Sequence, residues 1–258
     1  MNAPEDKFYR ARITRREDFG PDLWMLRVQP SGEFKFTPGQ YATLGVQGLD
    51  KRSERPYSIV SSPHESEIEF FFELVPQGEL TPLLHKLQPG DEMLIRKVAK
   101  GRFTLDITKG RANHLLVSTV TGVAPFVSFV RSLYQEWKEG RFSGEQKLFL
   151  LNGASRSWEF GYCQELQKFA EEVPWLKYAP TVSRPWEDEK WTGETGRVDD
   201  LLRKYTDLWG LNGANSVGYL CGHPMMVENS MGILKRIGFT KELLKEEIYW
   251  VPTKHAAQ

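Results

Sequence analysis

The tetrapeptide Arg55-Pro56-Tyr57-Ser58 brings a permanent cation, a phenol and a hydroxyl together in a segment typical of an extended strand. Successive side chains of a strand point to opposite faces, so Arg55 and Tyr57 share one face and Ser58 lies on the other. A guanidinium binds phosphate through paired hydrogen bonds, and tyrosine offers an apolar ring with a polar tip. These groups suit a flavin nucleotide, although so short a motif also fits an ordinary strand edge with a surface arginine.

A second candidate anion site is the stretch Gly78-Glu79-Leu80-Thr81, which precedes apolar residues at helical spacing and predicts a short helix over 80–87. Backbone N–H groups at the start of a helix attract anions, and the Thr81 hydroxyl is placed to assist them. The stretch is therefore a candidate pyrophosphate site, and it is equally typical of a plain helix start.

The turn at residues 119–125 (TVTGVAP) follows a predicted strand and begins a predicted helix. In a parallel α/β sheet this is where phosphates bind, because small residues let the backbone approach and the helix dipole favours negative charge. Residues 221–224 (CGHP) follow another predicted strand, so we expect them to border the same cleft. The alternatives are structural helix starts, with Cys221 as a small buried residue and His223 as a loop residue.

Two arginines lie near the end of a further predicted strand: Arg184 follows Ser183, and Arg197 follows Gly196 across an exposed loop over 184–196. Two guanidinium groups with a hydroxyl suit the 2′-phosphate that distinguishes NADP from NAD, whereas an acidic side chain suits a free 2′-hydroxyl. Ordinary surface arginines are an equal alternative.

The elements that position these residues fall into two sets. Strands predicted over 23–28, 41–46, 57–60, 68–75 and 92–98, with Pro/Gly turns between them, indicate a closed antiparallel barrel. Beyond residue 109, strands predicted over 114–118, 147–151, 177–182, 217–221 and 248–251 alternate with helices over 124–137, 158–170 and 225–236. This alternation indicates a parallel sheet with helices on both faces. We predict domains over 1–108 and 109–258.

Composition excludes several classes of protein. Lys and Arg together number 34, as do Asp and Glu, so no net field favours nucleic acid or a membrane surface. The two cysteines, Cys163 and Cys221, provide no disulfide framework, zinc spacing or iron–sulfur set. The chain has no run of roughly 20 apolar residues, and its amino terminus lacks the apolar core of a signal peptide. We expect a soluble cytoplasmic protein without a metal.

Taken in order, the motifs RPYS, GELT, TGVAP, the SR and GR pair and CGHPMMV resemble the ferredoxin–NADP(+) reductase family, most closely its bacterial flavodoxin/ferredoxin-reducing members. The resemblance extends from about residue 8 to residue 250. It implies an antiparallel β-barrel FAD-binding domain followed by an α/β, Rossmann-like NADP-binding domain with a C-terminal tail. The implied reaction is hydride transfer between NADP(H) and FAD N5, coupled to one-electron exchange with ferredoxin or flavodoxin.

The resemblance also implies roles for individual residues. Arg55 would bind the FAD phosphates, Tyr57, next to Pro56, would pack on the flavin, and Ser58 would lie by N5. The flavin edge and pyrophosphate would be held by Val75, Gly78, Leu80 and Thr81. On the nucleotide side, Thr121 and Gly122 would meet the nicotinamide end, and the 2′-phosphate would meet Ser183, Arg184 and Arg197, with Arg156 as another nucleotide-side arginine. Cys221 would border the nicotinamide, Trp250, or alternatively Tyr249, would stack on the flavin, and Glu247 would relay a proton or orient a ligand.

One departure concerns the nucleotide turn, which commonly begins Gly-Thr-Gly in this family and has Val120 at the first position here. A β-carbon at that position restricts how closely a cofactor approaches. Two other readings stay open, and Val120 is the hint for the second of them. One is an NAD(P)H-dependent oxygenase reductase or free-flavin reductase, and the other is a flavin-binding electron-transfer subunit without nicotinamide turnover. In each reading we expect a monomer.

Overall fold

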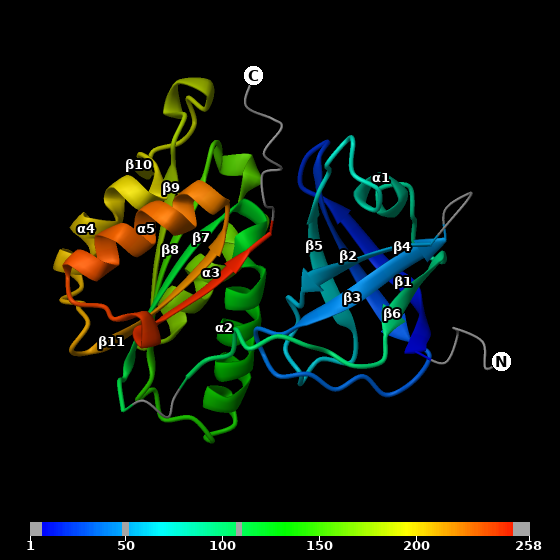
Figure 1. Ribbon diagram of the computed structural model, residues 1–258, viewed down its shortest axis with the longest axis horizontal. Helices are drawn as coiled ribbons and strands as arrows, with labels where there is room; N and C mark the ends of the chain where they lie inside the picture. The colour runs from blue at the N-terminus through cyan, green and yellow to red at the C-terminus, as the bar shows by residue number, and fades with distance from the viewer. Residues whose placement is uncertain (1–6, 48–51, 107–109, 250–258) are drawn as a thin grey trace. The chain divides into compact units, whose positions relative to one another are not determined.

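The computed structural model describes residues 7–47, 52–106 and 110–249 (Figure 1). By its internal contacts the chain divides into two compact units. The barrel unit comprises Met1–Leu105 with Ala124–Gln135, and the α/β unit comprises Asp106–Val123 with Glu136–Gln258. The domain bounds of 1–108 and 109–258 stay a prediction. The units differ from them in two places: the α/β unit already begins at Asp106, and most of the first long helix, Ala124–Gln135, belongs to the barrel unit.

The barrel unit contains six strands in one antiparallel sheet. They are β1 (Phe8–Asp18), β2 (Leu23–Pro30), β3 (Tyr41–Gln47), β4 (Arg52–Ser58), β5 (Ile68–Glu73) and β6 (Glu92–Arg96), in the order β4-β3-β6-β1-β2-β5. The two outer strands meet just beyond β4, where Ile59 bridges to Phe70 and the Val60 N–H donates to the Glu69 carbonyl at 2.9 Å. The sheet thus closes as the predicted antiparallel barrel, which removes unpaired strand edges.

The barrel core follows the period of two that strands impose. On β2, Trp24, Leu26 and Val28 are fully buried, and on β5 Phe70 and Phe72 are fully buried. The Trp24 ring stacks on Phe72 with centroids 5.3 Å apart. Aromatic residues at alternating positions on paired strands therefore fill the interior.

Three barrel elements differ from the sequence predictions. Strand β1 was not among the predicted strands, because its arginines and acids outnumber its buried residues Phe8, Ala11 and Ile13. Strand β4 begins at Arg52 instead of residue 57, since its pairing with β3 runs from Tyr41↔Ser58 to Gln47↔Arg52. The helix predicted over 80–87 is shorter, and α1 spans only Thr81–Leu84.

The α/β unit contains a six-stranded sheet in which all neighbouring strands are parallel. Its strands are β7 (Asn113–Thr119), β8 (Lys147–Ala154), β9 (Leu176–Val182), β10 (Glu194–Thr195), β11 (Ser216–Gly222) and β12 (Leu244–Ile248), in the order β10-β9-β8-β7-β11-β12. The helices are α2 (Ala124–Lys138), α3 (Cys163–Glu172), α4 (Val198–Leu208) and α5 (Pro224–Arg236). Helices α4 and α5 pack side by side over one face (Figure 1), and right-handed crossovers place α3 on the other.

Two predicted elements of this unit were wrong at their bounds. The last strand was predicted over 248–251, but β12 ends at Ile248, because it pairs with β11 from Gly218↔Leu244 to Gly222↔Ile248. The helix predicted over 158–170 begins only at Cys163, after a separate 3-10 turn, η3, over Ser157–Glu159. Helix α4 was not predicted at all. Its core face consists of only a few apolar positions in a charged sequence.

The described residues were also searched for membrane-spanning helices and metal sites. None of the helices within the described ranges combines the length and apolarity that a bilayer span needs. Within the same ranges, no group of three or more His, Cys, Asp or Glu residues is placed to bind a metal ion. The cysteines Cys163 and Cys221 are both free thiols.

The α/β unit contains a buried histidine, His114. His114 on β7 is fully buried, and its Nε2 lies 2.6 Å from Oε1 of Gln146. Its Nδ1 has no hydrogen-bond partner within the described part of the chain. Burial is the largest influence and lowers the pKa of His114 from its usual value of 6.5, so the folded protein keeps the ring neutral.

We therefore expect the free energy of unfolding to fall as the pH drops below about 6.5, because the unfolded chain binds a proton that the folded chain excludes. This loss ends once the pH is below the lowered folded pKa. Urea unfolding at several pH values measures the free energy of unfolding as a function of pH. We expect His114→Leu to reduce the slope of this dependence. His64→Gln, which changes an exposed histidine, is the control and should leave the slope unchanged. The same slope in wild type and His114→Leu would contradict the assignment.

Candidate functional site

The two candidate flavin motifs meet in the barrel unit. Arg55 on β4 lies with its Nη2 2.8 Å from Oε2 of Glu79, in the turn before α1. Both side chains are about half exposed. An exposed ion pair of this kind is worth little, so an entering phosphate can replace the carboxylate on Arg55. The structure therefore brings together the cation and the turn that the sequence assigned to a flavin pyrophosphate.

Tyr57 is held in place by the barrel core. Its ring packs edge-on against Phe72 with centroids 4.9 Å apart. Burial raises the pKa of Tyr57 to about 12, although the charge of Arg55 opposes this. The phenol thus stays protonated and can donate a hydrogen bond at neutral pH. Ser58 follows it as a buried residue at the end of β4.

The turn before α1 is fixed by its own threonine. The Thr81 hydroxyl accepts from the Val75 N–H at 3.0 Å and donates to the Val75 carbonyl at 3.1 Å. A β-carbon on Gly78 would lie 3.0 Å from that same carbonyl oxygen. The Leu80 side chain is buried in the barrel core. The side chains of Thr81 and Leu80 therefore stabilise the turn. A ligand there could bind only to their backbone groups.

The candidate nucleotide turn lies at the carboxyl ends of the neighbouring strands β7 and β11. Residues Val120–Val123 form a 3-10 turn, η2, that leads into α2. The Thr119 Oγ1 accepts from the His223 N–H at 2.9 Å, and a β-carbon on Gly122 would lie 2.2 Å from the Cys221 carbonyl oxygen. The 119–125 and 221–224 turns are thus in backbone contact. They meet where the strand order reverses, which is where open α/β sheets bind their ligands.

His223 has a structural task at this point. Its Nδ1 accepts a hydrogen bond from the Met225 N–H at 3.2 Å and so caps the start of α5. This confirms the interpretation of His223 as a residue of the helix start. A ring nitrogen that already accepts a backbone hydrogen bond cannot at the same time serve as a general base.

Val120 is strained. It has φ +40°, and no other residue except glycine has a positive φ in the described part of the chain. A β-branched side chain in this region costs roughly 1–2 kcal/mol. Its side chain packs against a buried cluster of Ala154, Phe160 and Val182, which offsets this cost. Val120 therefore stands where the family commonly has glycine, and its backbone adopts a conformation that favours glycine.

The predicted 2′-phosphate arginines lie together at one edge of the sheet. Arg156 follows β8, and Arg184 follows the adjacent strand β9. The ends of the two strands are linked by a hydrogen bond from the Arg184 N–H to the Ser155 carbonyl at 3.0 Å. Both arginines contact Glu187, and Arg156 also contacts Glu159. The Ser183 Oγ donates to the Ala154 carbonyl at 3.3 Å.

Arg197 joins this edge from the next strand. It follows β10, and the Gly196 N–H before it donates to the Val182 carbonyl at 2.9 Å. Its guanidinium lies 3.3 Å from Asp199. Residues that are up to 41 positions apart in sequence, from Arg156 to Arg197, are thus gathered by three neighbouring strands.

Cys221 lies on β11, next to the edge strand β12, at the other end of the strand order from β9 and β10. It is fully buried. It pairs in register with Glu247, and Tyr249 hydrogen-bonds to its thiol. Burial, and then the charge of Glu247, raises the pKa of the Cys221 thiol far above its usual range. Cys221 is therefore a neutral thiol and not a nucleophile. Trp250, the first choice for the stacking aromatic, lies outside the described residues.

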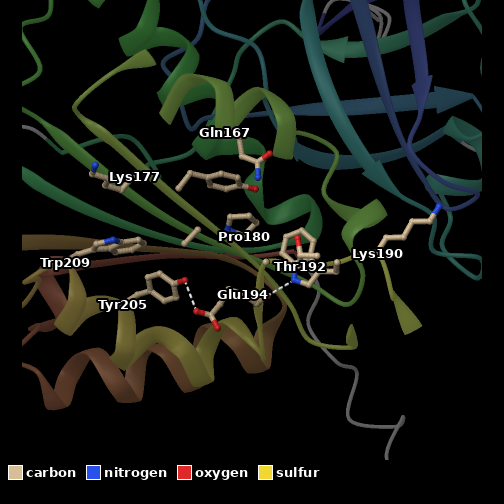
Figure 2. A pocket seen from close by; sticks show the side chains of 12 residues that line it. Gln167, Lys177, Pro180, Lys190, Thr192, Glu194, Tyr205 and Trp209 are labelled. Atoms are coloured by element: carbon tan, nitrogen blue, oxygen red, sulfur yellow. Dashed lines mark hydrogen bonds between the residues drawn. The ribbon is translucent and has the colours of Figure 1, made fainter. Parts of the chain in front are cut away.

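A cavity that the sequence did not predict lies along the outer edge of β9 (Figure 2). Its volume is about 490 Å³, and its walls include Trp191, Glu194, the α4 residue Tyr205 and Trp209, which follows the end of α4. The Tyr205 hydroxyl donates to Glu194 at 3.0 Å. The cavity exists because β10 pairs with β9 only at Thr181 and Val182. None of the predicted site residues lines it, and its signal in the sequence was the pair of aromatic residues Tyr205 and Trp209, four positions apart.

Comparison with known proteins shows which protein families this chain resembles. Residues 10–105 match the family described as an oxidoreductase FAD-binding domain, and residues 116–231 match the oxidoreductase NAD-binding domain. A flavodoxin/ferredoxin–NADP reductase of Escherichia coli K12 is 31% identical over 228 residues, covering 85% of this chain and 86% of that protein. A ferredoxin–NADP reductase of Pseudomonas aeruginosa is 26% identical over 246 residues, covering 89% and 90%.

Among solved structures, the fold is similar to that of a ferredoxin NADP+ reductase from Neisseria gonorrhoeae with bound FAD and NADP. The TM-score is 0.81 at 23% sequence identity, and the alignment covers 95% of this chain and 99% of that one. At this identity the similarity concerns the fold.

Proposed function

The chain belongs to the ferredoxin–NADP(+) reductase family, and we propose that it transfers a hydride between NADP(H) and FAD and exchanges single electrons with ferredoxin or flavodoxin. Family membership makes it an oxidoreductase with an FAD-binding and an NAD-binding domain. The observation that supports NADP(H) is the gathering of Arg156, Arg184 and Arg197 at the ends of adjacent strands. Three guanidinium groups at one edge suit a dianionic 2′-phosphate.

We propose that the barrel unit holds the flavin through the RPYS and GELT motifs. The residues fit an FAD, because an exposed cation, a neutral phenol and a glycine turn lie along β4 and its neighbouring turn. Arg55 would bind the phosphates, and Tyr57 would donate from a ring that Phe72 already orients. Ser58 would lie beside the flavin N5. FAD, when bound, supplies a hydride acceptor that can also release electrons one at a time.

On the α/β unit, Thr121 and Gly122 are proposed to receive the nicotinamide end of the nucleotide. Their backbone lies at the start of α2, where the helix dipole favours the adjoining pyrophosphate. The neutral Cys221 thiol would border the nicotinamide as an uncharged group, and Glu247, which pairs with it in register, would relay a proton or orient a ligand. Tyr249 hydrogen-bonds to this thiol, so a nicotinamide that contacts Cys221 would have to break that hydrogen bond.

Anaerobic titration of the purified flavoprotein with NADPH and with NADH tests the proposal. We expect bleaching of the flavin absorbance by NADPH at lower concentrations than by NADH, followed by reduction of an added ferredoxin or flavodoxin. Absence of bound flavin would contradict the family assignment of the barrel. Reduction by neither nucleotide would favour a flavin subunit without nicotinamide turnover, and equal use of both would favour an oxygenase or free-flavin reductase.

Arg184→Ala is expected to weaken NADPH binding by about 1–3 kcal/mol, because charged hydrogen bonds to the 2′-phosphate are lost. NADH lacks this phosphate and should bind nearly unchanged. The measurement is the KM of each nucleotide, with Arg203→Ala as a control, because Arg203 is an exposed α4 residue that pairs with Asp207. Equal losses for both nucleotides would assign Arg184 a structural role.

The proposal extends to the state of the protein in the cell. We expect a cytoplasmic monomer that meets its electron partner by diffusion, since the chain has no net charge that would hold it on a membrane surface. Sedimentation of the flavoprotein with and without ferredoxin measures both the oligomeric state and the complex.

A further inference from the structure

A carboxylate occupies the anion position between two of the candidate phosphate arginines. Glu187 contacts the guanidinium of Arg156 and lies 3.7 Å from that of Arg184. It ends the 3-10 turn η4 (Pro185–Glu187), and its N–H donates to the Arg184 carbonyl at 3.0 Å. The next residue, Asp188, anchors this turn by accepting from the Ser157 N–H at 2.7 Å. The fold therefore holds Glu187 between the arginines.

The three predicted phosphate arginines contact three carboxylates, Glu159, Glu187 and, at Arg197, Asp199, and Glu187 is the one able to leave. Glu159 also accepts from the Ser155 N–H at 2.8 Å, and its side chain is 16% exposed. Asp199 is almost fully buried and accepts from Asn229 at 2.7 Å. Glu187 is 35% exposed, and within the described part of the chain its side chain is bonded only to the two arginines. Its position is thus set by those guanidinium groups and can yield to a stronger anion.

We propose that Glu187 sets how strongly this enzyme prefers NADPH over NADH. A 2′-phosphate must displace the Glu187 carboxylate from Arg156 and Arg184, and the two anions then repel each other. A free 2′-hydroxyl has the opposite relation, because it can donate a hydrogen bond to a carboxylate that stays in place. The inference rests on the proposed function, in that Arg156 and Arg184 must receive the ribose end of the nucleotide.

The site therefore contains determinants for both nucleotides. The arginines favour the phosphate, and the carboxylate between them lowers that preference and favours the hydroxyl. Arginines alone, as the sequence presents them, suit a 2′-phosphate and so favour NADPH. With Glu187 in place, we expect NADPH to be preferred by a reduced margin.

Glu187→Gln tests this inference, because glutamine keeps the length of the side chain and removes its charge. Calorimetry with 2′-phospho-AMP and with AMP measures binding at this edge independently of the flavin. We expect the variant to bind 2′-phospho-AMP on the order of tenfold more tightly, the usual scale of removing one like charge beside a bound anion, with AMP unchanged or weaker. The ratio of kcat/KM for NADPH over NADH should rise in the same proportion.

The matched control is Glu189→Gln, two residues further along the same loop, where the glutamate is exposed. It removes the same charge from the loop, and 2′-phospho-AMP affinity should stay within about twofold of wild type, as for an unpaired surface charge. Thermal melting checks that both variants are folded, and Glu187→Ser provides a second uncharged variant at the same position.

Unchanged or weaker 2′-phospho-AMP binding in both Glu187 variants would overturn the inference. Arg184→Ala separates the two possible reasons for such a result. If Arg184→Ala still loses affinity for 2′-phospho-AMP, the arginine site stands and only the role of Glu187 fails. If it loses none, the phosphate binds elsewhere, and the proposed preference for NADP(H) fails together with this inference.

Discussion

Glu69→Gln is expected to lower the free energy of unfolding of the barrel unit by about 3–5 kcal/mol, because it removes a buried counter-charge from two arginines. Glu69 on β5 is fully buried, and its Oε2 lies 2.6 Å from Nε of Arg27. Its Oε1 lies 3.1 Å from Nη1 of Arg131 on α2. The Arg131 side chain is only 12% exposed, so the loss of this carboxylate leaves at least that positive charge poorly solvated.

Urea unfolding of the wild type and the variant near neutral pH measures this effect. Glu65→Gln is the matched control, because Glu65 contacts the same two arginines at 3.5 and 3.7 Å but is 28% exposed. Burial raises the pKa of Glu65, so its carboxylate takes up a proton more readily than an exposed glutamate does. We expect the control to lose about 1 kcal/mol or less, as for a partly solvated pair. Equal losses would show that burial of Glu69 is not what makes its ion pairs important.

This cluster also matters for the site, because α2 continues directly from the nucleotide turn. Ser128 and Ser132 on α2 donate to the Ser61 carbonyl at 2.7 Å and to the Ser62 hydroxyl at 3.0 Å. Together with Arg131, they bind one face of α2 to the barrel loop that follows β4. A weaker cluster should therefore loosen the start of α2 as well as the barrel. Hydrogen exchange in α2 of the Glu69 variant would show this as faster opening.

Gly122→Ala is the second large change. It is expected to destabilise the α/β unit by about 2–4 kcal/mol, since the added β-carbon meets backbone that cannot move aside. That carbon would lie 2.2 Å from the Cys221 carbonyl oxygen and 2.8 Å from the Gly222 Cα. The 119–125 and 221–224 turns must then separate, and the proposed nicotinamide position borders both of them. We expect nucleotide binding to weaken by about tenfold or more, as for a misplacement of roughly 1 Å at a positioning contact.

Val120→Gly, two residues earlier, is the control for this prediction. Glycine relieves the strain at φ +40° but loses packing on Ala154 and adds backbone entropy to the unfolded chain, so we expect a change in stability of about 1 kcal/mol or less. Nucleotide affinity should be unchanged or higher. Calorimetry and thermal melting on both variants measure these effects. Unimpaired binding in Gly122→Ala would show that this glycine is not at the ligand.

Much of the fold could be predicted because its signals are local. Alternating apolar residues on β2 and β5 and the alternation of strands with helices beyond residue 109 follow from the period of each element. Elements with few apolar residues were missed, namely β1, where arginines dominate, and α4, where acids and lysines do. The end of β12 was misplaced because its partner strand sets it, and pairing between distant strands leaves no mark in a local pattern.

The sequence by itself determined which chemistries are available: a cation and a phenol in RPYS, glycine turns after two strands, and arginines near the ends of others. Only the tertiary structure decided how these groups are used. It commits the Thr81 hydroxyl to Val75, buries the Cys221 thiol beside Glu247, and places Glu187 between Arg156 and Arg184. The physical reason is that residue type sets the hydrogen bonds and charges a side chain can offer. Its partners, solvation and backbone angle depend on segments far away in the chain.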